Sequence, residues 1–163
     1  MRNLVKLTLA AIATAGVTAT GVTVASAAPA AASGTEYIQV MSASVTPAPA
    51  SAIARGVFTA AGQARLGDTR GGTITFPGGT LVLSHRQAHG SSRFYPASCL
   101  SVISQSGSYR IARGTGRYAM ISGHGTYQLS LEIVGARVNG SCSSARPPLA
   151  QQELLRLSGP VRR

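Results

Sequence analysis

Apolar and polar residues alternate over several short stretches of this chain, which is the pattern of β-strands with one buried and one solvent-facing side. The clearest stretch runs from Thr126 to Val134, where the apolar face comprises Tyr127, Leu129, Leu131 and Ile133. No long window has the three- to four-residue period of an amphipathic helix. The pattern therefore predicts an all-β domain.

Short strands separated by glycine and proline favour a sandwich or a barrel over alternating strands and helices. The expected strands are Glu36–Met41, Ala52–Ala60, Gly72–Phe76, Thr80–His85, Leu100–Ser104, Ser108–Ala112, Tyr118–Ser122, Thr126–Val134 and Glu153–Leu157. The expected breaks include Pro77–Gly79, Gly90–Ser92, Gly107, Gly123–Gly125 and Asn139-Gly140. The glutamines before Glu153 also suit a helix, but the Gly-Pro break that follows favours a closing strand.

Strand periodicity also indicates which side chains point inward. Leu81 and Leu83 share a face with His85, so His85 lies at the end of an apolar row. Tyr109 is on the buried face of its strand, and its neighbour Arg110 faces solvent. No catalytic residue is assigned, but if the barrel encloses a cavity that works on a substrate, polar groups such as His85, Tyr109 or Tyr118 are the candidates to line it.

The first residues have the three parts of a secretory signal peptide. Arg2 and Lys6 precede a weakly apolar run, and Ala25-Ser26-Ala27 offers a small-x-small cleavage site, so we expect cleavage after Ala27. The run is rich in Thr and Gly, which disfavours an uncleaved membrane anchor, and no later run is long enough to span a membrane. The sequence thus predicts an extracellular protein that is not an integral membrane protein after processing.

The remaining chain suffices for one compact domain. Residues 1–27 are assigned to the signal peptide, residues 28–36 to a disordered leader rich in Ala, Pro, Ser and Gly, and residues 37–163 to the barrel domain. Cys99 and Cys142 both fall in the exported part, where an oxidising compartment favours a disulfide. A reactive or metal-binding pair is disfavoured because neither cysteine belongs to a Cys-x-x-Cys motif.

The chain carries a formal net charge of +11, and every cation after Lys6 is an arginine. Arginine suits carboxylates and phosphates, so an anionic cell-surface polymer is one candidate partner. The arginines are spread from Arg55 to Arg163, and no aromatic RNA-binding motif accompanies them. We therefore expect no specific nucleic-acid partner and favour a solvated basic surface.

Motifs for cofactors are weak. Residues Gly114–Ala119 match the G-x-G-x-x-A pattern of dinucleotide-binding folds, but a further strand is expected where that fold needs a helix. We interpret Gly114 and Gly116 as a barrel corner, and Gly123–Gly125 as a second bend. No cofactor is expected.

The sequence also offers little evidence for a catalytic or metal-binding combination of residues. There is no Gly-x-Ser-x-Gly motif, and the four acidic residues, Glu36, Asp68, Glu132 and Glu153, show no spacing that pairs two of them for glycoside hydrolysis. His85 and His89 straddle a strand end and lack a clear third ligand, with His124 as a distant candidate, so no metal site is expected. Asn139-Gly140-Ser141 matches a glycosylation sequon, but Asn-Gly favours a tight turn, which we prefer.

Several segments together resemble secreted actinobacterial proteins with an allene oxide cyclase-like or dirigent-like barrel. They are Thr75–Leu81, His85, Cys99, Gly107–Tyr127, Cys142 and Ser158–Val161. The resemblance implies an eight-stranded barrel with a hydrophobic interior. Plant relatives cyclise an epoxide or guide radical coupling, and some bacterial relatives cyclise polyketides. The acid and tyrosine positions of those enzymes find no match here, so no catalytic residue is carried over.

These observations lead to a secreted, disulfide-stapled β-barrel that binds a small apolar ligand or has a structural role. A barrel of eight strands can just hold one such ligand. The first alternative is a cyclase-like or dirigent-like enzyme that works by confining a reactive conformer in the cavity. The second is a factor that binds an anionic surface through its arginines.

Overall fold

The computed structural model describes residues 32–45, 48–67 and 71–163. They belong to one compact unit, Ala31–Arg163. The expected signal peptide and its cleavage site at Ala27 lie outside the described residues.

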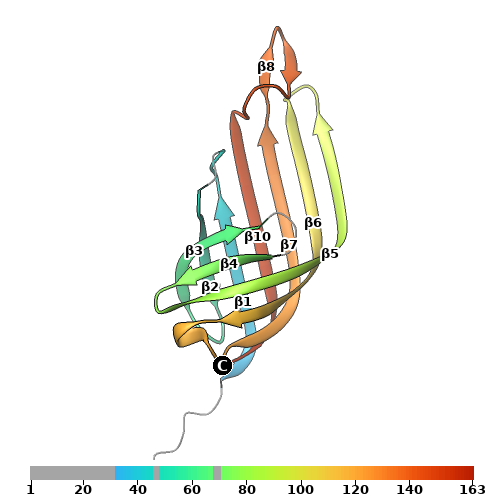
Figure 1. Ribbon diagram of the computed structural model, residues 1–163. Helices are drawn as coiled ribbons and strands as arrows, with labels where there is room; N and C mark the ends of the chain where they lie inside the picture. Colours follow the sequence, from blue (N-terminus) through green and yellow to red (C-terminus); the bar gives the residue numbers. More distant parts are fainter. Residues whose placement is uncertain (1–31, 46–47, 68–70) are drawn as a thin grey trace, which may run out of the picture. The chain divides into compact units, whose positions relative to one another are not determined.

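Eight antiparallel strands close into a barrel, which confirms the all-β prediction (Figure 1). Around the barrel the order is β1-β10-β7-β6-β5-β4-β3-β2, so β1 pairs with both β10 and β2. The barrel strands are β1 Ser33–Ser42, β2 Ala50–Arg55, β3 Ala60–Leu66, β4 Gly71–Phe76, β5 Gly79–Tyr95, β6 Leu100–Gly114, β7 Ser122–Val134 and β10 Ala150–Arg162. A separate hairpin consists of β8 Ala136–Val138 and β9 Ser141–Ser143.

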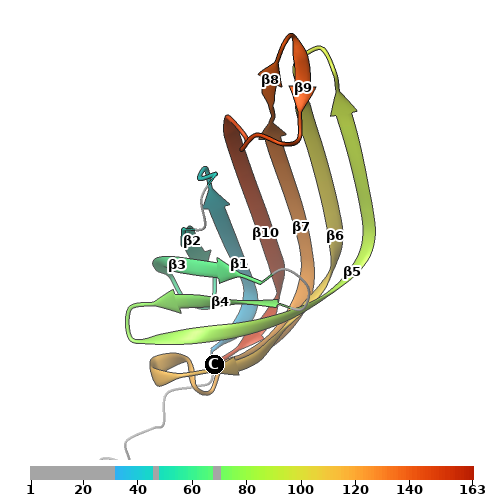
Figure 2. The same cartoon turned by 45° about the horizontal axis from the view of Figure 1, so that its top comes forward.

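Four of the strands are longer than the barrel wall requires. β5, β6, β7 and β10 curve out of the barrel and continue side by side toward the β8–β9 hairpin (Figure 2). β1 pairs with β10 only as far as Glu153, opposite Ser42. The inner face of the barrel therefore continues onto an open four-stranded sheet, which places a mouth where the barrel wall ends.

The expected breaks at Gly90–Ser92, Gly107 and Gly123–Gly125 are wrong, because each lies inside a long strand. Glycine is required at some of these positions for close approach rather than for chain reversal. A β-carbon at Gly107 would meet the carbonyl oxygen of Arg86, and one at Gly125 would meet that of Ser158. Such glycines let neighbouring strands bend tightly together. The two strands expected around Gly107 are therefore one strand, β6.

Three further boundaries differ from the sequence prediction. The expected strand Ala52–Ala60 is divided between β2 and β3, since Gly56 turns the chain at a φ of 141°. The expected strand at Tyr118–Ser122 is replaced by a short 3-10 helix, η1 (Gly116–Tyr118), because Gly116 adopts a φ of 56°. β1 begins at Ser33, so residues 33–36 belong to the barrel and not to a leader.

The barrel core is apolar and closes around a cluster of aromatic rings. The ring centroid of Phe58 lies 5.8 Å from that of Phe76 and 5.2 Å from that of Tyr118. Tyr109 and Ile111 are buried as the periodicity predicted, and Leu81 and Leu83 join them in the same core.

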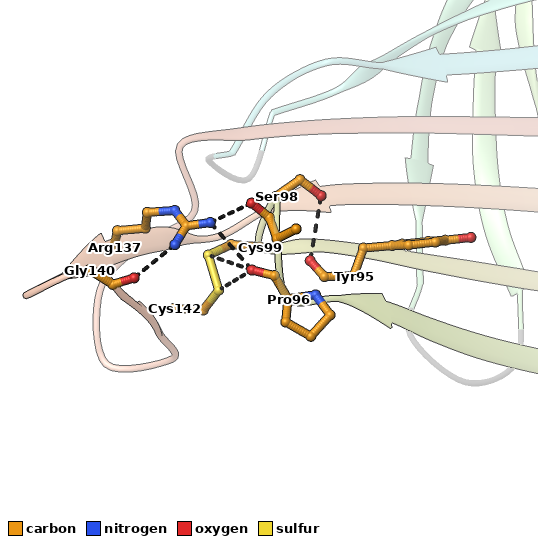
Figure 3. Close-up of a disulfide and its surroundings, with 8 residues drawn as sticks. Tyr95, Pro96, Ser98, Cys99, Arg137, Gly140 and Cys142 are labelled. Carbon is orange, nitrogen blue, oxygen red and sulfur yellow. Dashed lines mark hydrogen bonds between the residues drawn. A yellow bond between two sulfur atoms is a disulfide. The ribbon is translucent and has the colours of Figure 1, made fainter.

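A disulfide between Cys99 and Cys142 fixes the far end of the long strands, as expected (Figure 3). It joins the β5–β6 turn to β9. The Arg137 guanidinium supports the same junction, because it donates to the carbonyl oxygens of Ala97 at 2.6 Å and Gly140 at 2.8 Å. Asn139 and Gly140 both have positive φ, 51° and 81°, which confirms the predicted tight turn.

Candidate functional site

A cavity of about 350 Å³ lies on the inner face of the sheet, where the barrel opens onto the long strands. Strand alternation places its side chains there: Tyr127 and Leu129 on β7 point to the same side as Leu155 and Leu157, their partners on β10. Six leucines line it: Leu66, Leu83, Leu129, Leu131, Leu155 and Leu157. Among the described residues, the polar ones in the lining are His85, Gln105, Tyr109, Tyr127 and Glu153.

Two of the three candidate cavity residues meet at this site. His85 on β5 stands opposite Tyr109 on β6, and both line the cavity. The His85 ring also packs edge to face against Tyr127, with 5.3 Å between ring centroids. The third candidate, Tyr118, is fully buried in the aromatic cluster with Phe58 and is not part of the cavity lining.

Tyr127 and Glu153 were not among the candidate site residues of the sequence. Tyr127 heads the apolar row of its strand, and Glu153 shares its strand face with Leu155 and Leu157. The alternation of apolar residues could therefore have predicted that both side chains point into the cavity. Burial raises the pKa of Glu153 above its ordinary value.

The two tyrosines of the cavity lining keep their hydroxyl groups neutral and unpaired. Within the described residues, neither the Tyr109 nor the Tyr127 hydroxyl has a hydrogen-bond partner, and both are buried. Burial, and then the charge of Glu36, raises the pKa of Tyr109 to about 12. Burial also raises the pKa of Tyr127. At neutral pH both phenols are therefore hydrogen-bond donors rather than bases.

Glu36 is fully buried but does not belong to the cavity lining. Its Oε2 accepts a hydrogen bond from the Phe58 backbone N–H at 3.1 Å, while Oε1 has no partner among the described residues. Burial raises the pKa of Glu36, and backbone hydrogen bonds from Phe58, Val57 and Arg55 oppose that rise. The carboxyl group thus satisfies the backbone at the corner between β2 and β3.

Paired-carboxylate chemistry finds no support from Glu36 and Glu153. Glu36 stands opposite Gly159 and Glu153 opposite Ser42, which separates the two by six positions along β1. At about 3.3 Å per residue that separation is about 20 Å. Glycoside hydrolases hold their two carboxyl groups within roughly 5–9.5 Å.

The histidines do not gather into a metal site. His85 lines the cavity, whereas His89 borders two hollows on the outer surface. Across the described parts of the chain, no group of three or more His, Cys, Asp or Glu side chains lies close enough to hold a metal ion.

The glycine motif at Gly114–Ala119 forms a corner, as interpreted from the sequence, and only the three-residue η1 follows it. The Arg117 N–H donates to the Gly78 carbonyl oxygen at 2.8 Å, and a β-carbon at Gly116 would meet that same oxygen. The site therefore lacks the helix N-terminus that holds a pyrophosphate. By contrast, Gly123 and Gly125 lie inside β7 and form no separate bend.

In the portion of the chain that the structure describes, no helix is long and apolar enough to cross a membrane. Comparison with known proteins finds no matching family model, no similar curated protein and no similar solved structure.

Proposed function

We propose that this protein is a secreted binding protein that holds one small, mainly apolar molecule in the cavity at the barrel mouth. The observation that carries the proposal is the cavity of about 350 Å³ with six leucines in its lining. Pockets for small molecules usually measure roughly 300–1,000 Å³ and combine apolar walls with a few polar groups. This cavity fits the lower end of that range.

The polar side chains of the cavity lining indicate which functional groups a ligand should carry. Tyr109 and Tyr127 are neutral donors without a partner, and a buried donor left unpaired costs about 1–3 kcal/mol. Both hydroxyl oxygens are fully buried, so a ligand oxygen recovers part of that cost only when the tyrosine side chain turns its hydroxyl toward the cavity. Glu153 lines the same cavity, and two carboxyl groups that share an apolar site cannot both ionise without repulsion, so a carboxylate on the ligand is disfavoured. We therefore propose an uncharged ligand that carries a carbonyl, ether or hydroxyl oxygen.

We propose further that the protein is secreted and that its barrel is of the allene oxide cyclase-like type. The Cys99–Cys142 disulfide suits an oxidising extracellular compartment. The closed eight-stranded antiparallel barrel is the architecture that the resemblance implies. Both support a small extracellular carrier or scavenger of apolar molecules.

Titration with N-phenyl-1-naphthylamine, a neutral fluorophore that brightens in apolar surroundings, tests the proposal. Leu129 lines the cavity, so Leu129→Trp should fill it and weaken probe binding at least tenfold. Its neighbour Ser130 lies on the opposite face of β7 and borders an outer hollow, so Ser130→Trp is the matched control. Equal affinity in both variants, or no saturable binding by the wild-type protein, would refute a ligand cavity.

A second candidate function is a cyclase-like or dirigent-like enzyme, favoured by the contact between His85 and Tyr127. Neutral phenols that line an apolar cavity can donate to an oxygen that gains negative charge, and the cavity can hold a folded substrate conformer. Mass spectrometry of small molecules that co-purify from culture medium separates the two functions. If the wild-type protein and Tyr127→Phe carry isomers of equal mass, the enzyme is favoured, whereas one identical molecule in both favours binding alone.

A further inference from the structure

The outer face of the same strands carries a groove bordered by many polar side chains. Three adjoining hollows, of about 550, 400 and 740 Å³, lie over the outward side of β2, β1, β10, β7, β6 and β5. Gln128 borders all three, and Arg156 borders two of them. We call this continuous surface the outer groove. Its polar side chains lie on the opposite face of the sheet from the cavity, although Gln105, Tyr127, Leu129 and Leu157 border both.

Strand register lines up the side chains of the outer groove in two neighbouring rows. One row comprises Arg55, Tyr37, Ser158, Thr126, Ser108 and Arg86, in the order of the strands. The next comprises Ile53, Gln39, Arg156, Gln128, Ser106 and His89. Most of these side chains end in a hydroxyl, an amide or a guanidinium group, so the groove offers many hydrogen bonds.

The charges of the groove have one sign. Arg55, Arg86 and Arg156 border it, whereas no Asp or Glu among the described residues does. Strands lie about 4.8 Å apart and the two rows about 7 Å apart, so Arg55 and Arg156 are separated by about 12 Å and Arg156 and Arg86 by about 16 Å. Uncharged side chains stand between them, so the positive charges are spaced rather than continuous.

We propose that the outer groove binds an acidic polysaccharide in which carboxylate-bearing sugars alternate with neutral ones. The guanidinium forks of Arg55, Arg156 and Arg86 pair with carboxylates, while Gln128 and Gln39 bond to sugar hydroxyls. Tyr37, 59 % exposed at one end of the groove, offers a ring face to the C–H side of a sugar.

A nucleic acid suits this surface less well. A phosphodiester chain carries a charge on every unit, and proteins that bind one usually place cations along its whole length. Single-stranded binding also uses several aromatic side chains for base stacking. Tyr37 is the only tyrosine, phenylalanine or tryptophan in the two rows, and His89 is the only other side chain there with a ring.

Titration calorimetry with size-defined hyaluronan oligosaccharides tests the proposal, since hyaluronan alternates uronate and neutral sugars. Neutral dextran oligosaccharides and single-stranded DNA of equal charge number serve as the comparison ligands. We expect hyaluronan to bind more tightly than either, and its affinity to fall as salt rises. Tighter binding of the DNA, or hyaluronan affinity no higher than that of dextran, would overturn the proposal.

Charge-neutralising variants localise the binding. Arg156→Gln and Arg86→Gln should each lower hyaluronan affinity by about two- to fivefold, the range of exposed ion pairs. Arg113→Gln removes the same charge from an exposed position outside the hollows and should leave the affinity within the error of wild type. An equal loss in Arg113→Gln would show diffuse attraction by net charge and contradict a groove. Probe binding in the cavity should remain unchanged in all three variants.

Discussion

The carboxyl group of Glu36 and the backbone N–H of Phe58 are joined by a 3.1 Å hydrogen bond inside the barrel. Glu36 lies near the start of β1, and Phe58 lies in the corner between β2 and β3. The Glu36 carboxyl group thus accepts the hydrogen bond of the Phe58 N–H in place of a backbone carbonyl. Its cost is a fully buried carboxyl group whose second oxygen has no partner among the described residues.

Glu36→Gln should become more stable relative to the wild type as pH rises. Burial raises the folded-state pKa of Glu36 above 4.5, so the folded protein binds this proton more tightly than the unfolded chain. That contribution to the free energy of unfolding is complete below the unfolded pKa and is lost as pH rises through the raised folded pKa. Gln keeps an acceptor for Phe58 and has no proton to lose.

Urea unfolding of both proteins between pH 4 and pH 8 measures this difference. Glu132→Gln, at an exposed position of β7, is the control and should keep a constant difference from wild type. Glu36→Ala removes the acceptor altogether and should be about 1–3 kcal/mol less stable than Glu36→Gln at every pH, since neither side chain titrates. A free energy of unfolding of Glu36→Gln that falls relative to that of wild type as pH rises would contradict the assignment.

Tyr109→Phe should flatten the alkaline loss of stability. The pKa of Tyr109 is raised from 10.0 to about 12, so the unfolded chain releases this proton before the folded protein does. The wild type should lose about 1.4 kcal/mol between pH 8 and pH 11 from this group alone, since one pKa unit corresponds to about 1.4 kcal/mol. At pH 8 the variant should be no less stable than wild type, because the hydroxyl has no partner.

Circular dichroism during urea unfolding at pH 8, 10 and 11 provides the measurement. Tyr37→Phe, an exposed substitution of the same kind, should decline with pH as the wild type does. If Tyr109→Phe also declines as steeply as wild type, the phenol is not the group responsible.

Replacing both cysteines, Cys99→Ser with Cys142→Ser, should lower the free energy of unfolding by about 3–4 kcal/mol. The bridge closes a sequence separation of 43 residues, and a loop of that size contributes this amount on the chain-entropy model. Hydrogen exchange should rise first in the β8–β9 hairpin, which the bridge attaches to the β5–β6 turn. Dithiothreitol should lower the free energy of unfolding of the wild type by the same amount as the double substitution, and should leave the variant unchanged. Any other result would mean that the disulfide does not provide this stability.

Two glycines with positive φ form a matched pair for a packing test. Gly56 has a φ of 141°, and a β-carbon there would meet the Thr35 carbonyl oxygen. Gly140 has a φ of 81°, and a β-carbon there would find nothing within 4 Å. Gly140→Ala should therefore cost about 1 kcal/mol of backbone strain, and Gly56→Ala at least twice as much. Equal Tm values for the two variants would contradict the close packing of Gly56 against the Thr35 carbonyl oxygen.

The sequence predicts the fold class because strand alternation is a local signal. Tyr109, Leu83 and Tyr127 are buried as their alternation indicates. Strand ends were predicted less well, since Gly107 and Gly125 were assigned to breaks. Whether a glycine ends a strand or lets it bend depends on the neighbouring strand, here the carbonyl oxygens of Arg86 and Ser158, which a single segment does not reveal.

The candidate site was predictable in part for a similar reason. His85 and Tyr109 occupy inward positions of their strands, and pairing of β5 with β6 brings them together. Tyr118 was misplaced because its segment forms η1 and not a strand, which turns the ring into the core. Glu153 reaches the cavity because β10 pairs with β7. The β8–β9 hairpin separates these two strands in the sequence, so a local pattern does not reveal that they pair.

The most direct test of a ligand cavity is an anomalous difference map from crystals soaked with 1-bromonaphthalene. The bromine marks where an uncharged apolar molecule settles. We predict one dominant peak within van der Waals contact of Leu83, Leu129 and Leu155, all of which line the cavity. A peak confined to the outer surface, or a barrel mouth that stays free of bromine while other sites fill, would contradict the proposal that this barrel holds a small apolar ligand.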